Sequence, residues 1–519
     1  MIEKRIRDKE LLRYHPDKMI VKVRPEAAAP ARAGVRSFGA LESASAGLGI
    51  LQRLERAGVV KAVHSLAGPS RGFEPEVIRR GRTMTAAALE TSFAAERQDP
   101  SKGGSMLVEL SQQSEDELAR LRLQLVDDPY VEYASLVPIR YLMLPAKKRP
   151  RAGIAATPPA TNTLWNLDKI LWRQARGRNG FVDADGVSIA VLDSGIDEFH
   201  PDLQPVMSSN TMGYPDVPSS SSKDVIGHGT HVAGIIGAAM NNGVGINGVC
   251  RCQLHGWKIF DDEPDYDGES YVYWVDPVMY YRALRACIRE GIQIVNLSIG
   301  GGGEPDQDEK ALFAEMVEKG TVVVAAMGNE RTIGSPVSYP AALPGVIAVG
   351  ATDLADRVAR FSNSGNHISV SAPGVGIWST LPTYAGQTGF NVGTSPAGRR
   401  VPGSPHKREI DYDEWDGTSM AAPHVAGAAA LYLARNPDAS PEQVKDALER
   451  SADQVPGMRG RDHHPDFGFG RINLEALLAP PAGPSSARKR PARKVAAKKA
   501  PARKAAKAAA KKGAARKPA

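Results

Sequence analysis

The chain has 519 residues, which at about 150 residues per domain predicts roughly three structural units and a large buried core. Its 42% apolar and 24% charged residues are typical of a globular protein, and three cysteines are too few for a disulfide-stapled scaffold. No run reaches the roughly 18 apolar residues that a membrane span requires, and residues 1–18 lack the apolar core of a signal peptide. We therefore expect reduced thiols and a cytoplasmic protein without a transmembrane segment.

The net charge of +7 combines two regions of opposite sign. Residues 479–519 contain 14 Lys or Arg residues and no acidic residue, so residues 1–478 carry a net charge of −7. The same 41 residues hold 16 Ala and 6 Pro. A segment of this composition cannot bury a core, which predicts a disordered, basic tail over 479–519.

The first 144 residues alternate predicted strands and helices. Apolar patterning predicts strands at 18–25, 106–110 and 130–142, and helices at 41–59 and 114–125. This order is typical of a small α+β domain. The Pro-, Ala- and basic-rich stretch at 145–163 then predicts a linker.

From residue 164 to 478, short apolar runs alternate with helical patterns. The predicted strands are 187–193, 292–300, 321–327 and 345–351, and the predicted helices include 277–290, 307–319 and 441–450. Strands that are apolar on both faces indicate a parallel sheet covered on each side by helices, which is a three-layer α/β domain. Chemistry is expected at the carboxyl ends of such strands.

Three polar residues stand at positions where such chemistry is expected. Asp193 closes the strand at 187–193, His228 lies in GHGTHVAG at 227–234, and Ser419 begins an Ala-rich helix. Each alone has an ordinary structural reading, respectively a turn cap, a packed histidine and a helix N-cap. Together they supply the carboxylate, imidazole and hydroxyl of a nucleophilic serine, in the order Asp, His, Ser. Chymotrypsin-type enzymes and α/β-hydrolases use other orders.

The segments VLDSGID (191–197), GHGTHVAGI (227–235) and GTSMAAPHVAG (417–427) resemble the three signature blocks of the subtilisin-like serine peptidases. The likeness extends over about 164–476. It implies a serine endopeptidase that forms an acyl-enzyme, in which Asp193 orients His228, His228 is the general base and Ser419 the nucleophile. No cofactor is needed for this chemistry. His231 and His424, within the same blocks, are expected to be structural.

The resemblance also implies the remaining parts of the site. Asn329, in AAMGNE at 325–330, matches the oxyanion-hole segment and would donate its side-chain amide beside the backbone N–H of Ser419. An ordinary Gly-Asn turn is the alternative. The expected substrate-binding residues are Ser298, Ile299, Gly300, Gly328 and Ser338. Ser338 stands where many relatives have glycine, which predicts a narrower pocket for the residue before the cleaved bond.

A structural calcium site is a further implication of the resemblance. Asp202 and Asn242 would supply side-chain oxygens, and Met240, Val244 and Ile246 would supply backbone carbonyls. A turn without metal is the alternative. Residues 382–415 form a longer insertion than relatives have, which predicts a long surface loop. It would cover the cleft, offer a processing site at Arg399-Arg400, or be a tolerated insertion.

Residues 1–144 are similar to propeptides of this family, which implies a folding assistant and intramolecular inhibitor whose last strand enters the cleft. A permanent binding domain is the alternative. We expect self-cleavage between Tyr141 and Thr163, where the last predicted strand meets the linker. Proteins or peptides are the expected substrates.

A function of another class is also open: a nucleic-acid-associated binding protein on an inactive protease scaffold. The tail repeats Pro-Ala-Arg-Lys at 491–494 and 501–504 and resembles the basic tails of linker histones. Because it has no aromatic residues, contact with DNA or RNA would be electrostatic and independent of base sequence. A merely solubilising tail is the alternative.

Overall fold

The computed structural model describes residues 13–24, 49–66, 105–142 except 112, 164–211 and 223–480. Met1–Leu478 and Ala479–Ala519 form two separate units. The predicted linker, most of the tail and residues 41–48 of the first predicted helix lie outside the described residues, so the domain boundaries stay predictions. No helix within the described ranges is long and apolar enough to span a membrane.

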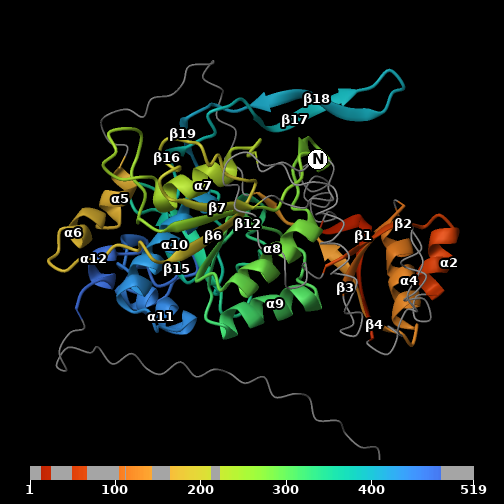
Figure 1. The fold of residues 1–519 in the computed structure, drawn as a ribbon, viewed down its shortest axis with the longest axis horizontal. Helices are drawn as coiled ribbons and strands as arrows, with labels where there is room; N and C mark the ends of the chain where they lie inside the picture. Colours follow the sequence, from red (N-terminus) through yellow and green to blue (C-terminus); the bar gives the residue numbers. More distant parts are fainter. Residues whose placement is uncertain are drawn as a thin grey trace, which may run out of the picture. The chain divides into compact units, whose positions relative to one another are not determined.

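A seven-stranded sheet lies at the centre of the described residues after 164 (Figure 1). Its spatial order is β15 (Val370–Pro373), β14 (Ile347–Thr352), β13 (Val322–Ala326), β11 (Ile294–Leu297), β6 (Ser188–Asp193), β8 (Gln253–Lys258) and β7 (Met207–Thr211). Every neighbouring pair is parallel. The four predicted strand runs correspond to β6, β11, β13 and β14, which confirms the parallel α/β architecture.

Helices cover both faces of this sheet. The helices of this part are α5 (Trp165–Lys169), α6 (Trp172–Arg176), α7 (His228–Gly237), α8 (Pro277–Glu290), α9 (Gln307–Glu318), α10 (Thr418–Arg435), α11 (Pro441–Ser451) and α12 (Leu474–Leu477). Because successive side chains of a strand point to opposite faces, Ile189 and Val191 of β6 pack with α7 and α10. Ala190 and Leu192 pack with α8 and α9 instead. One apolar cluster thus lies on each face of the sheet, between the sheet and the helices, which gives the predicted three layers of helices, sheet and helices.

The N-terminal residues form a four-stranded antiparallel sheet in the order β2 (Val60–Ser65), β3 (Ser105–Leu110), β1 (Tyr14–Val23) and β4 (Val131–Pro138). Helix α2 (Gly49–Arg56) and helix α4 (Glu115–Val126) accompany it, and α4 begins with a capping box between Ser114 and Glu117. The predicted α+β class is therefore confirmed. Ile20 and Val137 belong to the same apolar cluster as α8, so this sheet packs directly on the three-layer α/β part.

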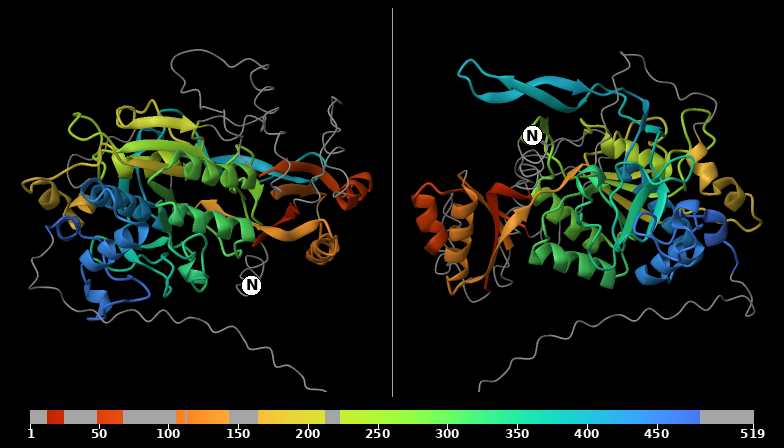
Figure 2. Two further views of the ribbon diagram at one scale, coloured as in Figure 1. Left: turned by 60° about the horizontal axis from the view of Figure 1, so that its bottom comes forward. Right: turned by 180° about the vertical axis from the view of Figure 1, so that it is seen from behind.

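The prediction of a long surface loop at 382–415 is wrong, because most of this insertion is paired strand. It contains β17 (Gln387–Thr394), β18 (Arg400–Lys407) and β19 (Tyr412–Trp415). The β17–β18 hairpin extends from the body in Figure 1 and in the right view of Figure 2, while β19 pairs with β16 (Ile377–Thr380). Hairpin pairing satisfies the backbone hydrogen bonds of this segment without apolar side chains, and the length of the insertion alone does not indicate such pairing.

Candidate active site

Asp193 is the last residue of β6 and is fully buried. Its Oδ1 accepts a hydrogen bond from the backbone N–H of Ser194 at 2.7 Å and another from Nδ1 of His228 at 2.7 Å. The second bond fixes the orientation of the imidazole and occupies Nδ1, so that Nε2 is the ring nitrogen left for a reacting group. Nε2 of His228 is buried and has no hydrogen-bond partner among the described residues. It is therefore placed to accept a proton from a group that it meets.

Close packing of α7 against β6 makes this pair possible. The residue after His228 is Gly229, where a Cβ atom would lie 2.1 Å from the carbonyl oxygen of Gly195 and 3.0 Å from Cβ of Asp193. Any side chain would force the helix away from the strand. The glycine in this motif is thus required for the Asp193–His228 hydrogen bond.

Asp224 is a second buried carboxylate at this end of α7, and it is not among the site residues predicted from the sequence. Its oxygens accept hydrogen bonds from the backbone N–H groups of Gly227 and Thr230, at 2.7 and 2.8 Å. They also accept from the hydroxyls of Ser194 and Thr230. A carboxylate in this position caps the helix that begins at His228, and its negative charge interacts favourably with the positive end of the helix dipole. An acidic residue shortly before GHGT was the available signal.

The two other histidines of the motifs have structural partners, as expected. Nε2 of His231 donates to the carbonyl oxygen of Asp413 at 3.1 Å, and its ring stacks on Trp415. Nδ1 of His424 donates to the carbonyl oxygen of Met420, and its Nε2 accepts from Asn166. Burial lowers the pKa of His231 to about 3 and that of His424 to about 4. Both rings are therefore neutral near pH 7.

Ser419 is buried in the first turn of α10, after the N-cap residue Gly417. The ordinary reading of Ser419 as an N-cap is therefore wrong. Its hydroxyl donates to the carbonyl oxygen of Ser298 at 2.9 Å, and the hydroxyl of Ser298 donates back to the carbonyl oxygen of Ser419 at 3.0 Å. Because Ser298 directly follows β11, which neighbours β6, Ser419 is held at the edge of the sheet where Asp193 lies.

Asn329 follows β13 and is anchored to the start of α10. Its Oδ1 accepts hydrogen bonds from the backbone N–H of Thr418 at 3.0 Å and from the hydroxyl of Thr418 at 2.8 Å. The neighbouring Gly328 has a φ of +101°, and its N–H donates to the same hydroxyl. Because the amide oxygen is fixed in this way, the direction of the amide NH2 group is fixed as well. The anchoring residue, Thr418, directly precedes Ser419.

The expected substrate-binding strand is already paired within this chain. β12 (Ile299–Gly300) pairs antiparallel with β5 (Tyr141–Leu142), so that Tyr141 lies opposite Gly300. On the other side the carbonyl oxygen of Arg140 accepts from the N–H of Val275 at 2.8 Å. Residues 140–142 therefore lie between β12 and the segment that contains Val275, with backbone hydrogen bonds on both sides. The hydroxyl of Tyr141 donates to Glu330, directly after Asn329, at 3.0 Å.

Ser338 is buried, and its hydroxyl has no hydrogen-bond partner among the described residues. The position of Ser338 in a substrate pocket stays a prediction.

The predicted calcium ligands come together in a different way. Oδ1 of Asp202 accepts from the side-chain amide of Asn242 at 2.6 Å, and Oδ2 accepts from the N–H of Ile246 and the hydroxyl of Tyr412, each at 3.0 Å. Oδ1 of Asn242 accepts from the N–H of Val244. Three donors thus face the carboxylate where a cation would need free oxygens. The described residues contain no group of three His, Cys, Asp or Glu side chains that could hold a metal ion, but the predicted site has only one such side chain. Calcium therefore stays a prediction.

The fold and the site together define a subtilisin-type serine peptidase. A model of the subtilase family matches residues 184–471, more than half of the chain, and the chain belongs to this family.

Two relatives show how far the likeness reaches. The chain is 38% identical to subtilisin from Bacillus pumilus over 296 residues, which are 56% of this chain and 90% of the relative. It is 36% identical to fervidolysin from Fervidobacterium pennivorans over 336 residues, 62% of this chain, and thus spans only 44% of fervidolysin. The crystal structure of fervidolysin matches 90% of this chain and 61% of that chain with a TM-score of 0.58. At 24% identity, that match shows the shared fold alone.

Proposed function

We propose that this chain is an endopeptidase that cleaves protein substrates through an acyl-enzyme. Ser419 attacks the carbonyl carbon of the cleaved bond, while Nε2 of His228 takes the hydroxyl proton and then gives it to the leaving amine. Water enters by the same route in reverse and releases the acyl group. The observation that carries this proposal is the buried His228–Asp193 pair, in which Asp193 holds Nδ1 at 2.7 Å and Nε2 remains available.

Asn329 and the backbone N–H of Ser419 would bind the oxyanion of the tetrahedral intermediate. The hydrogen bonds of Thr418 to Oδ1 of Asn329 support this role, because a donor that is already oriented needs no reorganisation when charge develops. The first turn of α10 adds the positive end of its dipole. No catalytic step requires a cofactor.

The N-terminal domain would act as an intramolecular inhibitor. Its residues 140–142 lie between β12 and the segment that contains Val275, with backbone pairing on both sides. This is the position that an extended substrate would take. Self-cleavage after this strand, between Tyr141 and Thr163, would convert the inhibitor into a separate product.

Labelling with a fluorophosphonate probe tests the peptidase proposal. We expect the wild-type chain to take up the probe at Ser419 and the Ser419→Ala variant to take up none. N-terminal sequencing of the same two samples should show a new terminus between residues 142 and 163 in the wild type and residue 1 in the variant. Equal labelling of the two proteins would contradict the proposed nucleophile. An intact N-terminus on a fully labelled, active wild type would contradict the inhibitor role alone.

The basic tail would bind nucleic acid through charge. Residues 479–519 contain 14 Lys and Arg residues and no acidic residue, whereas the rest of the chain has a net charge of −7. If about half of these charges neutralise phosphates, the slope of log affinity against log salt is about −6. We expect the full chain to be retained on duplex DNA at low salt and a chain ending at Leu478 to pass through, with equal activity on a short peptide. Equal retention of the two would refute this role.

We also infer a reducing, cytoplasmic compartment for the chain. The cysteines support this inference because Cys250, Cys252 and Cys287 are all buried and free. Cell fractionation tests it.

A further inference from the structure

Arg140 is a charged side chain in an apolar setting, and only 2% of it is exposed. It directly precedes β5, which contains Tyr141, and its carbonyl oxygen accepts a hydrogen bond from the N–H of Val275. A peptide bound in this register would therefore present its own side chain at the place of Arg140.

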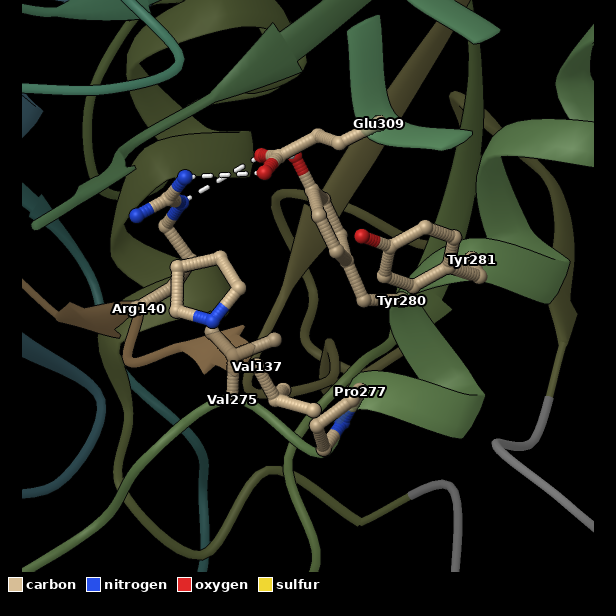
Figure 3. Close-up of a pocket in the computed structure, with 8 residues that line it drawn as sticks. Val137, Arg140, Val275, Pro277, Tyr280, Tyr281 and Glu309 are labelled. Atoms are coloured by element: carbon tan, nitrogen blue, oxygen red, sulfur yellow. Dashed lines mark hydrogen bonds and ion pairs between the residues drawn. The ribbon is translucent and has the colours of Figure 1, made fainter. Parts of the chain in front are cut away.

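The guanidinium group of Arg140 is held in a pocket that ends at Glu309 in the first turn of α9 (Figure 3). Nε donates to Oε1 of Glu309 at 3.2 Å and Nη2 to Oε2 at 2.8 Å. Nη1 donates to the carbonyl oxygen of Gly303 at 2.8 Å. The planar group thus uses its nitrogens in two directions. A lysine ammonium, a single point charge, could not match the carboxylate and the carbonyl in this way.

Apart from Arg140 and its neighbours in the N-terminal domain, the peptidase domain forms the pocket. The hydroxyl of Tyr280 donates to Oε1 of Glu309 at 3.1 Å, and the ring of Tyr339 lies 6.0 Å from the guanidinium carbon. Val275, Pro277 and Tyr281 complete the wall.

Glu309 itself is fully buried. A neutral side chain bound in the place of Arg140 would leave this carboxylate with the hydroxyl of Tyr280 and without a cation. A buried charge that lacks its partner is strongly unfavourable, so a strand in this position favours a cationic side chain there.

We propose that the Glu309 pocket is a specificity pocket that selects arginine in protein substrates, one residue before the residue that pairs with Gly300. The proposal rests on the peptidase function proposed above and deepens it by naming a substrate class. In this arrangement the N-terminal domain inhibits by presenting the side chain that the cleft prefers. The competing explanation is an ion pair that only joins the two domains.

Cleavage of matched peptides by the wild-type protein, after the self-cleavage proposed above, distinguishes these explanations. The peptides have the sequence of residues 137–146 and differ only at the position of Arg140, which is Arg, Lys or Gln. We expect kcat/KM for the Arg peptide to exceed that for either other peptide at least about tenfold, because the wrong side chain leaves the buried carboxylate unpaired. Glu309→Gln should bring the three values within about twofold of one another. Glu304→Gln, which removes an exposed carboxylate from the preceding loop, should keep the preference. Equal values in the wild type would overturn the proposal.

A binding measurement tests the pocket without catalysis. In a full-length Ser419→Ala, Arg140→Gln variant, the chain's own strand no longer supplies an arginine. Fluorescence anisotropy should then show at least about tenfold tighter binding of the Arg peptide than of the Gln peptide. Because Glu309 is unchanged in this variant, the result does not depend on the folding of Glu309→Gln. Equal affinities would overturn the pocket. Arginine-selective binding by a wild type that cleaves no peptide would instead contradict the peptidase function and leave the pocket in place.

Discussion

Replacing His228 with alanine is expected to lower kcat about 10⁶-fold, the size of the effect known for the same change in subtilisin itself. The physical reason is that this variant lacks the imidazole proposed to take the proton of Ser419. His231 cannot substitute, because its Nε2 is bound to the carbonyl oxygen of Asp413 and burial lowers its pKa to about 3. Steady-state hydrolysis of a fluorogenic peptide measures the loss.

A matched control is available in another buried histidine. His424→Gln removes the ring that bridges Asn166 and the carbonyl oxygen of Met420, so it should lower the melting temperature while the folded protein keeps most of its kcat. A His228→Ala protein that is folded and retains kcat at the level of this control would exclude His228 as the general base.

Replacing Asp193 with asparagine is expected to lower kcat about 10⁴-fold with little change in KM. The wild-type carboxylate only accepts hydrogen bonds, so Nδ1 of His228 must carry the proton and Nε2 is free to act as base. The amide of asparagine can donate to Nδ1, which moves the ring proton to Nε2 and blocks proton uptake from Ser419. Comparison of kcat and KM separately measures this effect.

Asp224→Asn is the control for charge and burial at the same end of α7. Four donors surround that carboxylate, so the substitution should weaken the helix cap and lower the melting temperature. Because Asp224 caps the helix rather than bonding His228 directly, its loss should reduce kcat far less than Asp193→Asn does. Equal losses in the two variants would mean that Asp193 acts only by stabilising the fold.

The strands that carry the motifs could be predicted because they are buried on both faces. β6, β11, β13 and β14 read as continuous apolar runs, and Asp193 could be placed at a strand end for the same reason. Strand β7 escaped prediction because its sequence, MSSNT, is polar and lies at the sheet edge. Strand β2, which begins directly after the helix predicted at 41–59, was not predicted. Gly58, with a φ of +71°, follows the observed end of that helix at Arg56.

The contact between Arg140 and Glu309 could not be predicted, although both residues are plain in the sequence. They are 169 positions apart. A glutamate in the first turn of a helix is ordinarily a surface residue that favours the helix dipole, and the pattern of α9 contains nothing that distinguishes Glu309 from such a residue. Only the docking of the N-terminal sheet buries both charges together. Long-range pairing of this kind depends on tertiary structure, whereas the triad motifs are recognisable locally.

While residues 140–142 remain part of the same chain, they reach the cleft as a tethered ligand. Their effective concentration is then on the order of millimolar, whatever the amount of protein in solution. Once the chain is cut after this strand, the same contacts hold together two separate molecules, and their occupancy falls as the protein is diluted. In the proposed inhibitor role, a single peptide bond would thus separate a state whose inhibition is independent of dilution from one in which the free cleft becomes more common as the protein is diluted.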